Sequence, residues 1–562
     1  MPVFLFAIIV VSGLWVGSLG AVPLAWLVVI AVACMHADLP PPRSFAALRM
    51  TDGLGTLAIA APTFIYLAAT WRQEFPYSGD QSYHNGEGAE AFALLWPWWW
   101  IAGAIAIVAV VVCARRGFRY APPIALVIAA VAGLAFHHPY SFAARYPGTL
   151  HVLAAPLRAL PLASPMNAER LLNAASIPVW LLVLRPRLLG RNVDLFALAA
   201  GALLLWQKDD VYYFTSGYLE PWAIVLVLTA AEHLVRFGRE EIWRPLLLLG
   251  AAAMVKEHVV IALPVVAVVF FHKALLPYAA SAIAPFFLFS RLRALFRPWS
   301  ATAPDFAAAI APARLAEYAQ RIEVQFGIAG LIVVALALIA LAVLATRSRP
   351  FLALFSIAFA DATFFLFARV MHFWPGTPRL NMVWLAMAAI AAGFVAERAR
   401  SLAIVLLIVI ANAIPLAPFV RDAFRPDTAR NFVEHSDAPV FYPLREALSG
   451  VKPGERVAFL NNGKWMFETF YPGPIGEQYT DLLSRVDVIS FKGAPERCRC
   501  TAGHAAVFAG FIRFTNLGAT LPQRAAIEAE AARCREELER SCGRTRAIVH
   551  EGVLTGVVGQ AR

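Results

Sequence analysis

The sequence has 562 residues, of which 60% are hydrophobic and 15% are charged, and its formal net charge is +11. A soluble protein of this length does not carry so many long apolar runs, so the composition indicates a polytopic membrane protein. The excess of lysine and arginine requires no nucleic-acid partner, because these residues cluster in short loops between the apolar runs.

The apolar runs predict an N-terminal hairpin followed by a transmembrane core. Residues 1–53 contain two runs, 3–19 and 22–36, without a basic lead-in or a small-residue cleavage site, so we expect a retained hairpin and a cytoplasmic loop. Residues 54–420 form the core, in which a span is about 20 residues long. Its spans are predicted at 54–70, 91–114, 121–136, 168–184, 195–207, 221–235, 245–271, 274–290, 328–345, 351–368, 380–396 and 402–419.

Basic loops predict the sidedness of these spans. Lysine and arginine enriched in alternate short loops mark the cytoplasmic side. One continuous span at 245–271 would place the basic loop at 346–349 outside, whereas a break at Lys256-Glu257-His258 keeps the alternation. Polar residues at membrane depth are tolerated where they line a cavity. We therefore predict about thirteen core spans. The predicted cytoplasmic loops are 115–119, 185–191, 236–244, 346–349 and 397–400.

Residues 421–562 have the composition of a soluble domain, which the topology places outside the membrane on the far side from the cytoplasm. Strands at 455–460, 485–491, 504–510 and 546–550, with helices at 442–448 and 523–540, predict a small α/β domain that caps the outer loops. It holds four of the six cysteines: Cys498, Cys500, Cys534 and Cys542. Two disulfides that join the 498/500 segment to the 534/542 segment are favoured over a zinc site, whose usual spacings differ.

Two acidic loops are predicted to face outward. In the first, residues 71–90, Asp80 follows a glycine that allows a tight turn. A carboxylate within reach of an acceptor hydroxyl can act as a general base, while turn capping is the alternative. The second loop, residues 208–220, begins with Asp209 and Asp210. These carboxylates could orient an acceptor or hold a divalent cation, while helix capping is the alternative.

Cationic residues supply the other half of the candidate site. Lys256 stands within an apolar run, and its ammonium group can bind a lipid phosphate; the alternative is an internal Lys–Glu pair that only holds the helix break. Arg379 begins a span, so its guanidinium can face phosphate oxygens, while snorkelling at a helix end is the alternative. The further candidates are His258 and Arg145 for the phosphate, and His84, Glu87, Glu220 and His372 for acceptor or sugar contacts.

Together these features resemble the GT-C glycosyltransferases, membrane enzymes that take sugars from polyprenyl-phosphate carriers. Within that superfamily the chain looks most like the aminoarabinose transferases of lipid A and the protein O-mannosyltransferases. One departure is that Gln81 follows Asp80, where many members have an Asp-Glu pair. The resemblance rests on Asp80, on Asp209 and Asp210, on MVKEHVVIALP (254–264) and on FWPGTPRLN (373–381), and it covers residues 54–420.

The resemblance implies an inverting transfer of a sugar to an acceptor hydroxyl, with Asp80 as the base. Lys256, Arg379 and His258 would stabilise the charge that builds on the leaving phosphate. It also implies a bacterial inner-membrane enzyme with a periplasmic C-terminal domain. The implied partners are the polyprenyl-phosphate sugar, membrane lipids and a lipid, glycan or protein acceptor, in a monomer that needs no certain cofactor, with a divalent cation left open.

Three other functions compete with this interpretation. A glycan polymerase or ligase also uses polyprenyl carriers but relies more on outer-loop arginines. A lipid or sugar transporter would show repeated halves and polar residues near the membrane midplane, whereas the carboxylates here lie mainly in loops and no internal repeat is evident. A structural scaffold would not need the polar residues at 256–258.

Overall fold

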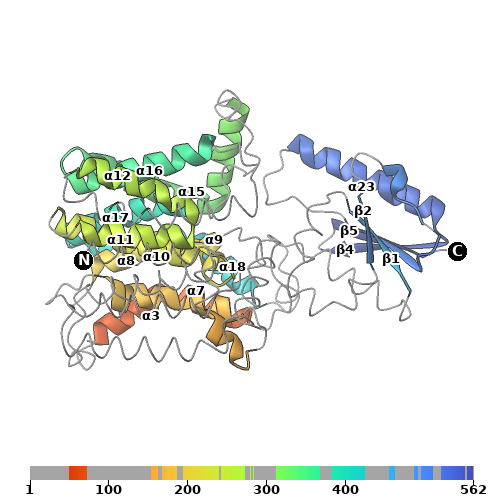
Figure 1. The fold of residues 1–562 in the computed structure, drawn as a ribbon, viewed down its shortest axis with the longest axis horizontal. Coiled ribbons are helices and arrows are strands. Elements are labelled where there is room, and N and C mark those ends of the chain that lie inside the picture. Colours follow the sequence, from red (N-terminus) through yellow and green to blue (C-terminus); the bar gives the residue numbers. More distant parts are fainter. Residues whose placement is uncertain are drawn as a thin grey trace, which may run out of the picture. The chain divides into compact units, whose positions relative to one another are not determined.

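The computed structural model describes residues 50–71, 154–162, 167–185, 194–239, 242–271, 279, 283, 312–367, 381–424, 455–461, 486–490, 495–500, 502–510, 521–550 and 553–560. The chain divides into two compact units, Met1–Ala69 with Glu90–Arg421, and Thr70–Ala89 with Asp422–Arg562. The described part of the first unit is a helical bundle, and the second unit carries a small sheet (Figure 1).

The bundle follows the apolar runs of the sequence. Three described helical segments, Gln325–Ala345, Met382–Ala399 and Leu402–Arg421, are long and apolar enough to cross a membrane. The predicted runs at 3–19, 22–36, 91–114 and 121–136, and nearly all of 274–290, lie outside the described residues. The described elements are α3 (Met50–Ala69), η3 (Ala155–Ala159), α7 (Asn167–Val179), η4 (Trp180–Leu184), α8 (Leu195–Leu205), α9 (Lys208–Phe214), α10 (Glu220–Phe237), α11 (Trp243–Val255), η5 (Glu257–Ile261), α12 (Ala262–Val269), α15 (Pro312–Ala345), α16 (Arg349–Phe367), α17 (Met382–Ala399) and α18 (Leu402–Asp422).

Local sequence signals set several helix ends. Asp194 caps α8, because its Oδ1 accepts a hydrogen bond of 3.0 Å from the amide of Ala197. Helix α10 begins at Glu220 with Pro221 in its first turn, where the missing amide hydrogen costs nothing. It ends at Phe237, and Gly238 follows as its cap with a φ of 56°, which suits glycine.

Helix α17 is the centre of the bundle. Every residue from Met382 to Gly393 is buried, and α17 packs against α8, α10, α15 and α16. At Gly393 the two backbones come close enough that an added Cβ would lie 2.8 Å from the carbonyl oxygen of Phe196 in α8. Glycine is therefore what allows α8 and α17 to meet at this point.

A network of charges joins four helices at one end of the bundle. Arg185, after η4, pairs with Glu232 of α10 and Asp194 at the start of α8, at 2.8 and 2.7 Å. Arg236 pairs with Glu232 at 2.7 Å and with Glu397 of α17 at 3.3 Å. Residues of three predicted cytoplasmic loops, 185–191, 236–244 and 397–400, are thus brought together, which agrees with their lying on one side of the membrane.

The predicted break in the long run at 245–271 is confirmed. Helix α11 ends at Val255, Lys256 has an extended backbone with φ −140° and ψ 115°, and η5 and α12 follow. Cα atoms of α11 and α12 approach within 8 Å. In one straight helix their nearest residues would be roughly 10 Å apart, at about 1.5 Å per residue, so the chain folds back on itself.

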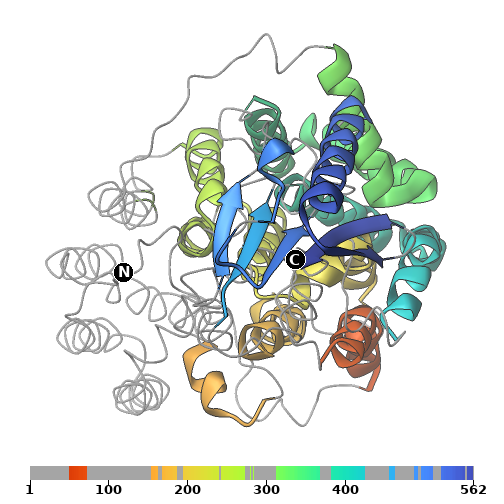
Figure 2. The same cartoon turned by 90° about the vertical axis from the view of Figure 1, so that its right-hand side faces the viewer.

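Helix α15 contains a sharp turn that the sequence analysis did not predict. Gly327 has φ 66° and ψ 167°, and it separates residues 312–326 from the apolar segment at 328–345. The sequence analysis placed residues 312–326 in a loop, and the structure makes them helical. Figure 2, which looks along the bundle, shows this first half of α15 lengthwise, so it runs across the bundle axis.

The second unit contains a mixed five-stranded sheet of order β2-β1-β3-β5-β4. Strands β1, β2 and β3 are parallel neighbours, whereas β5 pairs antiparallel with β3 and β4. The four predicted strands and the second predicted helix are confirmed, while β5 was missed; the predicted helix at 442–448 lies outside the described residues. The elements are β1 (Val457–Asn461), β2 (Val486–Ser490), η9 (Pro495–Arg497), β3 (Ala506–Gly510), α23 (Leu521–Ser541), β4 (Arg544–His550) and β5 (Val553–Gln560).

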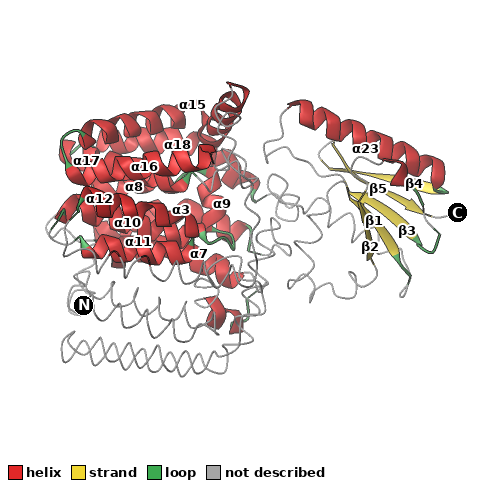
Figure 3. Ribbon diagram, turned by 45° about the horizontal axis from the view of Figure 1, so that its top comes forward, coloured by secondary structure: helices red, strands yellow, loops and turns green. Residues whose placement is uncertain are grey.

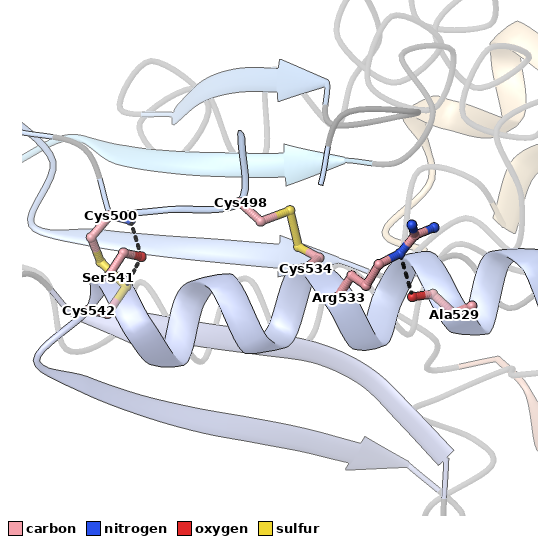
Figure 4. Close-up of a disulfide and its surroundings, with 7 residues drawn as sticks. All are labelled: Cys498, Cys500, Ala529, Arg533, Cys534, Ser541 and Cys542. Atoms are coloured by element: carbon pink, nitrogen blue, oxygen red, sulfur yellow. Dashed lines mark hydrogen bonds between the residues drawn. A yellow bond between two sulfur atoms is a disulfide. The ribbon is translucent and has the colours of Figure 1, made fainter. Parts of the chain in front are cut away.

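Two disulfides fasten α23 to the sheet. Cys498 pairs with Cys534 of α23, and Cys500 pairs with Cys542, which follows the last residue of that helix (Figure 4). Both therefore join the segment before β3 to α23 or its end. This confirms the predicted kind of pairing. The sulfur atoms lie in the core of the unit, together with Leu460, Val507 and other buried apolar side chains.

Candidate functional site

The second acidic loop is not an exposed loop. Residues 208–214 form the short helix α9, which packs against α3, α7, α8 and α10 at the end of the bundle where α10 begins (Figure 3). Asp209 and Asp210 stand in its first turn and are both buried, 4% and 0% exposed. The sequence analysis treated this segment as a loop because its carboxylates are typical of solvent-exposed residues.

Asp210 is a buried carboxylate, and neither of its oxygens forms a hydrogen bond with the described residues. Burial raises the pKa of this carboxyl group well above its ordinary value, and the neighbouring charge of Asp209 raises it further. Helix α9 lies outside the candidate membrane-spanning helices. Such a group either carries a proton or faces a polar ligand, and perturbed groups of this kind are characteristic of functional sites.

The turn after α9 is held firmly by α7. The guanidinium of Arg170 donates a hydrogen bond of 2.7 Å to the carbonyl oxygen of Thr215. The side-chain amide of Asn173 donates to the carbonyl oxygens of Ser216 and Tyr218 at 2.6 and 2.7 Å. All these side chains are buried, so the turn that carries the chain from Asp210 to Glu220 is fixed by the bundle.

An ion pair joins the start of α10 to the break after α11. The Nζ atom of Lys256 lies 3.1 Å from Oε1 of Glu220, and the two residues are 5% and 1% exposed. The lysine therefore pairs with a residue from another helix. His258 follows in η5 and is half-buried. Lys256, Glu220 and α9 thus lie at the same end of the bundle, opposite the Arg185–Glu232 network.

Six of the predicted site residues lie outside the described residues. Of the five described candidates, Glu220 and Lys256 form an ion pair, and His258 follows Lys256 in η5. Asp209 and Asp210 stand in α9, which packs against α10. Among the described residues, no group of three histidine, cysteine, aspartate or glutamate side chains is arranged to hold a metal ion. The six residues that are not described are Asp80, His84, Glu87, Arg145, His372 and Arg379.

Besides Glu232 of the charge network, sequence reasoning missed two buried carboxylates. Asp361 in α16 is 1% exposed, and neither oxygen meets hydrogen-bond geometry with the described residues, although the group faces the backbone N–H of Trp384 in the first turn of α17. Glu169 in α7 is 1% exposed and pairs with Arg158 at 2.7 Å. A single acidic residue in an apolar run was the available signal for Asp361.

Comparison with known proteins adds no further information about the site. No protein-family model matches the chain, and no curated protein sequence matches it.

Proposed function

We propose that the protein is a membrane glycosyltransferase that moves a sugar from a polyprenyl-phosphate carrier to an acceptor hydroxyl at the outer face of the cytoplasmic membrane. The observation that carries this proposal is the pairing of opposite chemistries at one end of the bundle. Asp210 is buried without a hydrogen-bond partner among the described residues, and Lys256 is buried at a helix break in an ion pair with Glu220. In glycosyl transfer from a lipid phosphate, carboxyl groups can bind the acceptor hydroxyl and take its proton. A cation stabilises the negative charge that develops on the leaving phosphate.

The proposed reaction is a single displacement. The acceptor oxygen attacks the anomeric carbon, the bond from that carbon to the phosphate oxygen breaks, and the configuration is inverted. Asp80 takes the proton of the acceptor hydroxyl. The negative charge that develops on the leaving phosphate is stabilised by Lys256 and Arg379, assisted by His258 and Arg145.

Asp209 and Asp210 are proposed to orient the acceptor. Burial raises the pKa of Asp210 well above its ordinary value, which favours the protonated carboxyl group, and that form can donate a hydrogen bond to a sugar or acceptor oxygen. Glu220 pairs with Lys256, so its predicted contact with the acceptor or sugar would be made beside that lysine. His84, Glu87 and His372 remain proposed contacts of the same class.

The disulfides support an oxidising compartment for the second unit, because such bonds persist outside the cytoplasm. We place this unit on the periplasmic side of the bacterial inner membrane. The proposal covers lipid, glycan and protein acceptors.

Release of carrier phosphate tests the proposal. Purified protein is incubated with a radiolabelled polyprenyl-phosphate sugar pool, and free carrier phosphate and labelled acceptor are measured. Asp80→Asn is expected to abolish release, and Lys256→Met to reduce it strongly. Glu539→Gln is the matched control, because Glu539 in α23 is nearly half exposed and pairs with the exposed Arg535. Full activity of Asp80→Asn with normal folding would remove the assignment.

Lipid or sugar transport is a second candidate function, favoured by Asp361. In the described part of the bundle this buried carboxylate has no cationic partner, and such a group within a membrane commonly marks a substrate or ion pathway. If this function is correct, proteoliposomes will translocate the labelled carrier with its sugar still attached, and Asp361→Asn will stop that movement. Release of free carrier phosphate by the wild type would decide for the transferase.

A further inference from the structure

The first half of α15 leaves the bundle at Gly327. We call residues 312–326 the arm. The φ of 66° at Gly327 is one that side-chain-bearing residues rarely adopt, and no atom of the described residues would contact a Cβ built there. Glycine is thus needed for the backbone conformation and not for close packing. Figures 1 and 2 both show the arm turned across the axis of the bundle.

The length of the second half of α15 fixes the depth of this turn. Residues 328–345 rise by roughly 27 Å, at about 1.5 Å per residue. That rise matches a hydrocarbon core of about 30 Å. Arg347 and Arg349 follow directly at the far end. The turn at Gly327 therefore falls at the opposite membrane interface, where the arm begins.

The base of the arm is held by protein contacts. Gln325 and Phe326 are both buried, and Oε1 of Gln325 accepts a hydrogen bond of 2.8 Å from the side-chain amide of Asn381 at the start of α17. The ring of Phe326 lies 6.1 Å from that of Trp384, measured between centroids. These contacts set the direction in which the arm leaves the bundle.

The rest of the arm exposes an apolar stripe. Apolar residues recur at spacings of three and four, which places them on one side of the helix. Their burial decreases away from the base: Phe326 is buried, Ile322 is half-buried, and Leu315 is 43% exposed. The intervening positions of the sequence carry mostly charged and polar residues, among which Glu323 is exposed. The stripe consists of Pro312, Leu315, Ala319, Ile322 and Phe326.

The stripe continues an exposed apolar surface on the spanning half of α15. Beyond the turn, α15 exposes large apolar side chains along its spanning half, including Ile328 at 69% and Ile339 at 59%. In a membrane these side chains contact acyl chains. The arm starts at the interface and turns across the bundle axis. It carries an apolar stripe on one side and mostly polar residues between the stripe positions. These are the features of an amphipathic helix that lies in the membrane plane.

We propose that the arm lies in the membrane plane at the Gly327 end of α15 and buries its apolar stripe at the boundary between headgroups and acyl chains. The partner of the apolar stripe is thus the lipid surface itself. This inference is independent of glycosyl transfer, and its test measures contact with lipid rather than activity.

Site-directed fluorescence quenching in lipid nanodiscs tests the inference. Leu315→Cys is labelled with bimane in the full chain, in a background in which Cys34 and Cys113 are alanine. Leu315 is partly exposed, so its replacement does not threaten folding. Two quenchers are compared: lipids with a spin label near the headgroup, and iodide in water. The label at 315 is expected to lose most of its fluorescence with the lipid quencher and little with iodide.

Two control positions calibrate the measurement. A label at Ile339→Cys, in the exposed apolar surface of the spanning half, should respond to lipids spin-labelled near the chain end. A label at Arg535→Cys, on the exposed face of α23, should respond to iodide. The inference is overturned if the label at 315 responds to iodide as strongly as that at 535. It is also overturned if neither quencher acts, because another protein surface then covers the stripe.

Discussion

Arg185 makes a two-point contact with Glu232 inside the bundle. Its Nε and Nη2 atoms donate to the two carboxylate oxygens at 2.8 and 3.0 Å, and both side chains are buried. Removing one partner of such a pair leaves an uncompensated charge in a low-dielectric environment, which costs about 3–5 kcal/mol. We expect Glu232→Ala to reduce the free energy of unfolding by about 3 kcal/mol, at the lower end because Asp194 still pairs with Arg185.

Thermal unfolding in detergent, followed by tryptophan fluorescence, measures this loss. Arg535→Ala is the matched control, because Arg535 pairs with Glu539 at 2.7 Å with both side chains nearly half exposed. An exposed pair of this kind contributes about 0.3–0.5 kcal/mol. Equal effects of the two substitutions would show that the network at the end of α10 does not stabilise the bundle.

Gly393→Ala tests the close approach of α8 and α17. The added methyl group would lie 2.8 Å from the carbonyl oxygen of Phe196, which is backbone and cannot rotate away. Overpacking of this kind costs about 1–3 kcal/mol. Gly55→Ala in α3 is the control, because its added methyl would meet only a leucine side-chain carbon at 4.0 Å. A stability of the Gly393 variant equal to that of the control would contradict the packing described here.

Long apolar runs could be predicted from the sequence, because burial in lipid leaves a pattern of about 20 residues. The break at Lys256 was also predictable, since three polar residues interrupt an apolar run there. What could not be predicted is the partner of Lys256. Glu220 belongs to a different helix, and the two residues meet because α10 packs against α11, which brings the start of α10 beside the end of α11.

Other features of the structure could not be predicted, because the local sequence carries too little information about them. Helix α9 was interpreted as an exposed loop because Asp209 and Asp210 are charged, yet packing by four helices buries them. The turn at Gly327 depends on a single glycine within a run that is helical on both sides. Strand β5 has two glycines among its eight residues, which weaken strand propensity, and it is specified mainly by pairing with β3 and β4.

Opening the disulfides is expected to destabilise the second unit. The bonds Cys498–Cys534 and Cys500–Cys542 close segments of 36 and 42 residues. In the chain-entropy model each restricts the unfolded state by about 4 kcal/mol. We expect the two disulfides together to stabilise the unit by less than the sum of their separate contributions, because the two closed loops overlap. A fall in the unfolding temperature of this unit upon reduction, reproduced by Cys498→Ser with Cys534→Ser, would support this; no shift in either sample would contradict it.

The last prediction concerns acid stability of the second unit. Asp487 in β2 accepts hydrogen bonds from both Nε and Nη2 of Arg456, and Nε2 of His504 lies 2.8 Å from Oδ2 of the same carboxylate. The bonds from Arg456 are the largest cause of a lowered pKa, which falls to about 2. A carboxyl group whose pKa is lower in the folded state stabilises the fold only while it is ionised.

The sign of the pH dependence follows from this shift. The contribution of Asp487 is fully present above the ordinary pKa of about 3.9 and is lost as the pH falls from there towards 2. Scanning calorimetry should therefore show the unfolding temperature of the unit falling in this range. The side chain is 36% exposed, so the fall should be modest. The unfolding temperature of the Asp487→Asn variant should be lower than that of the wild type at neutral pH and should fall less on acidification. If the variant and the wild type fall in parallel between pH 4 and 2, another carboxyl group is responsible and the role given to Asp487 is wrong.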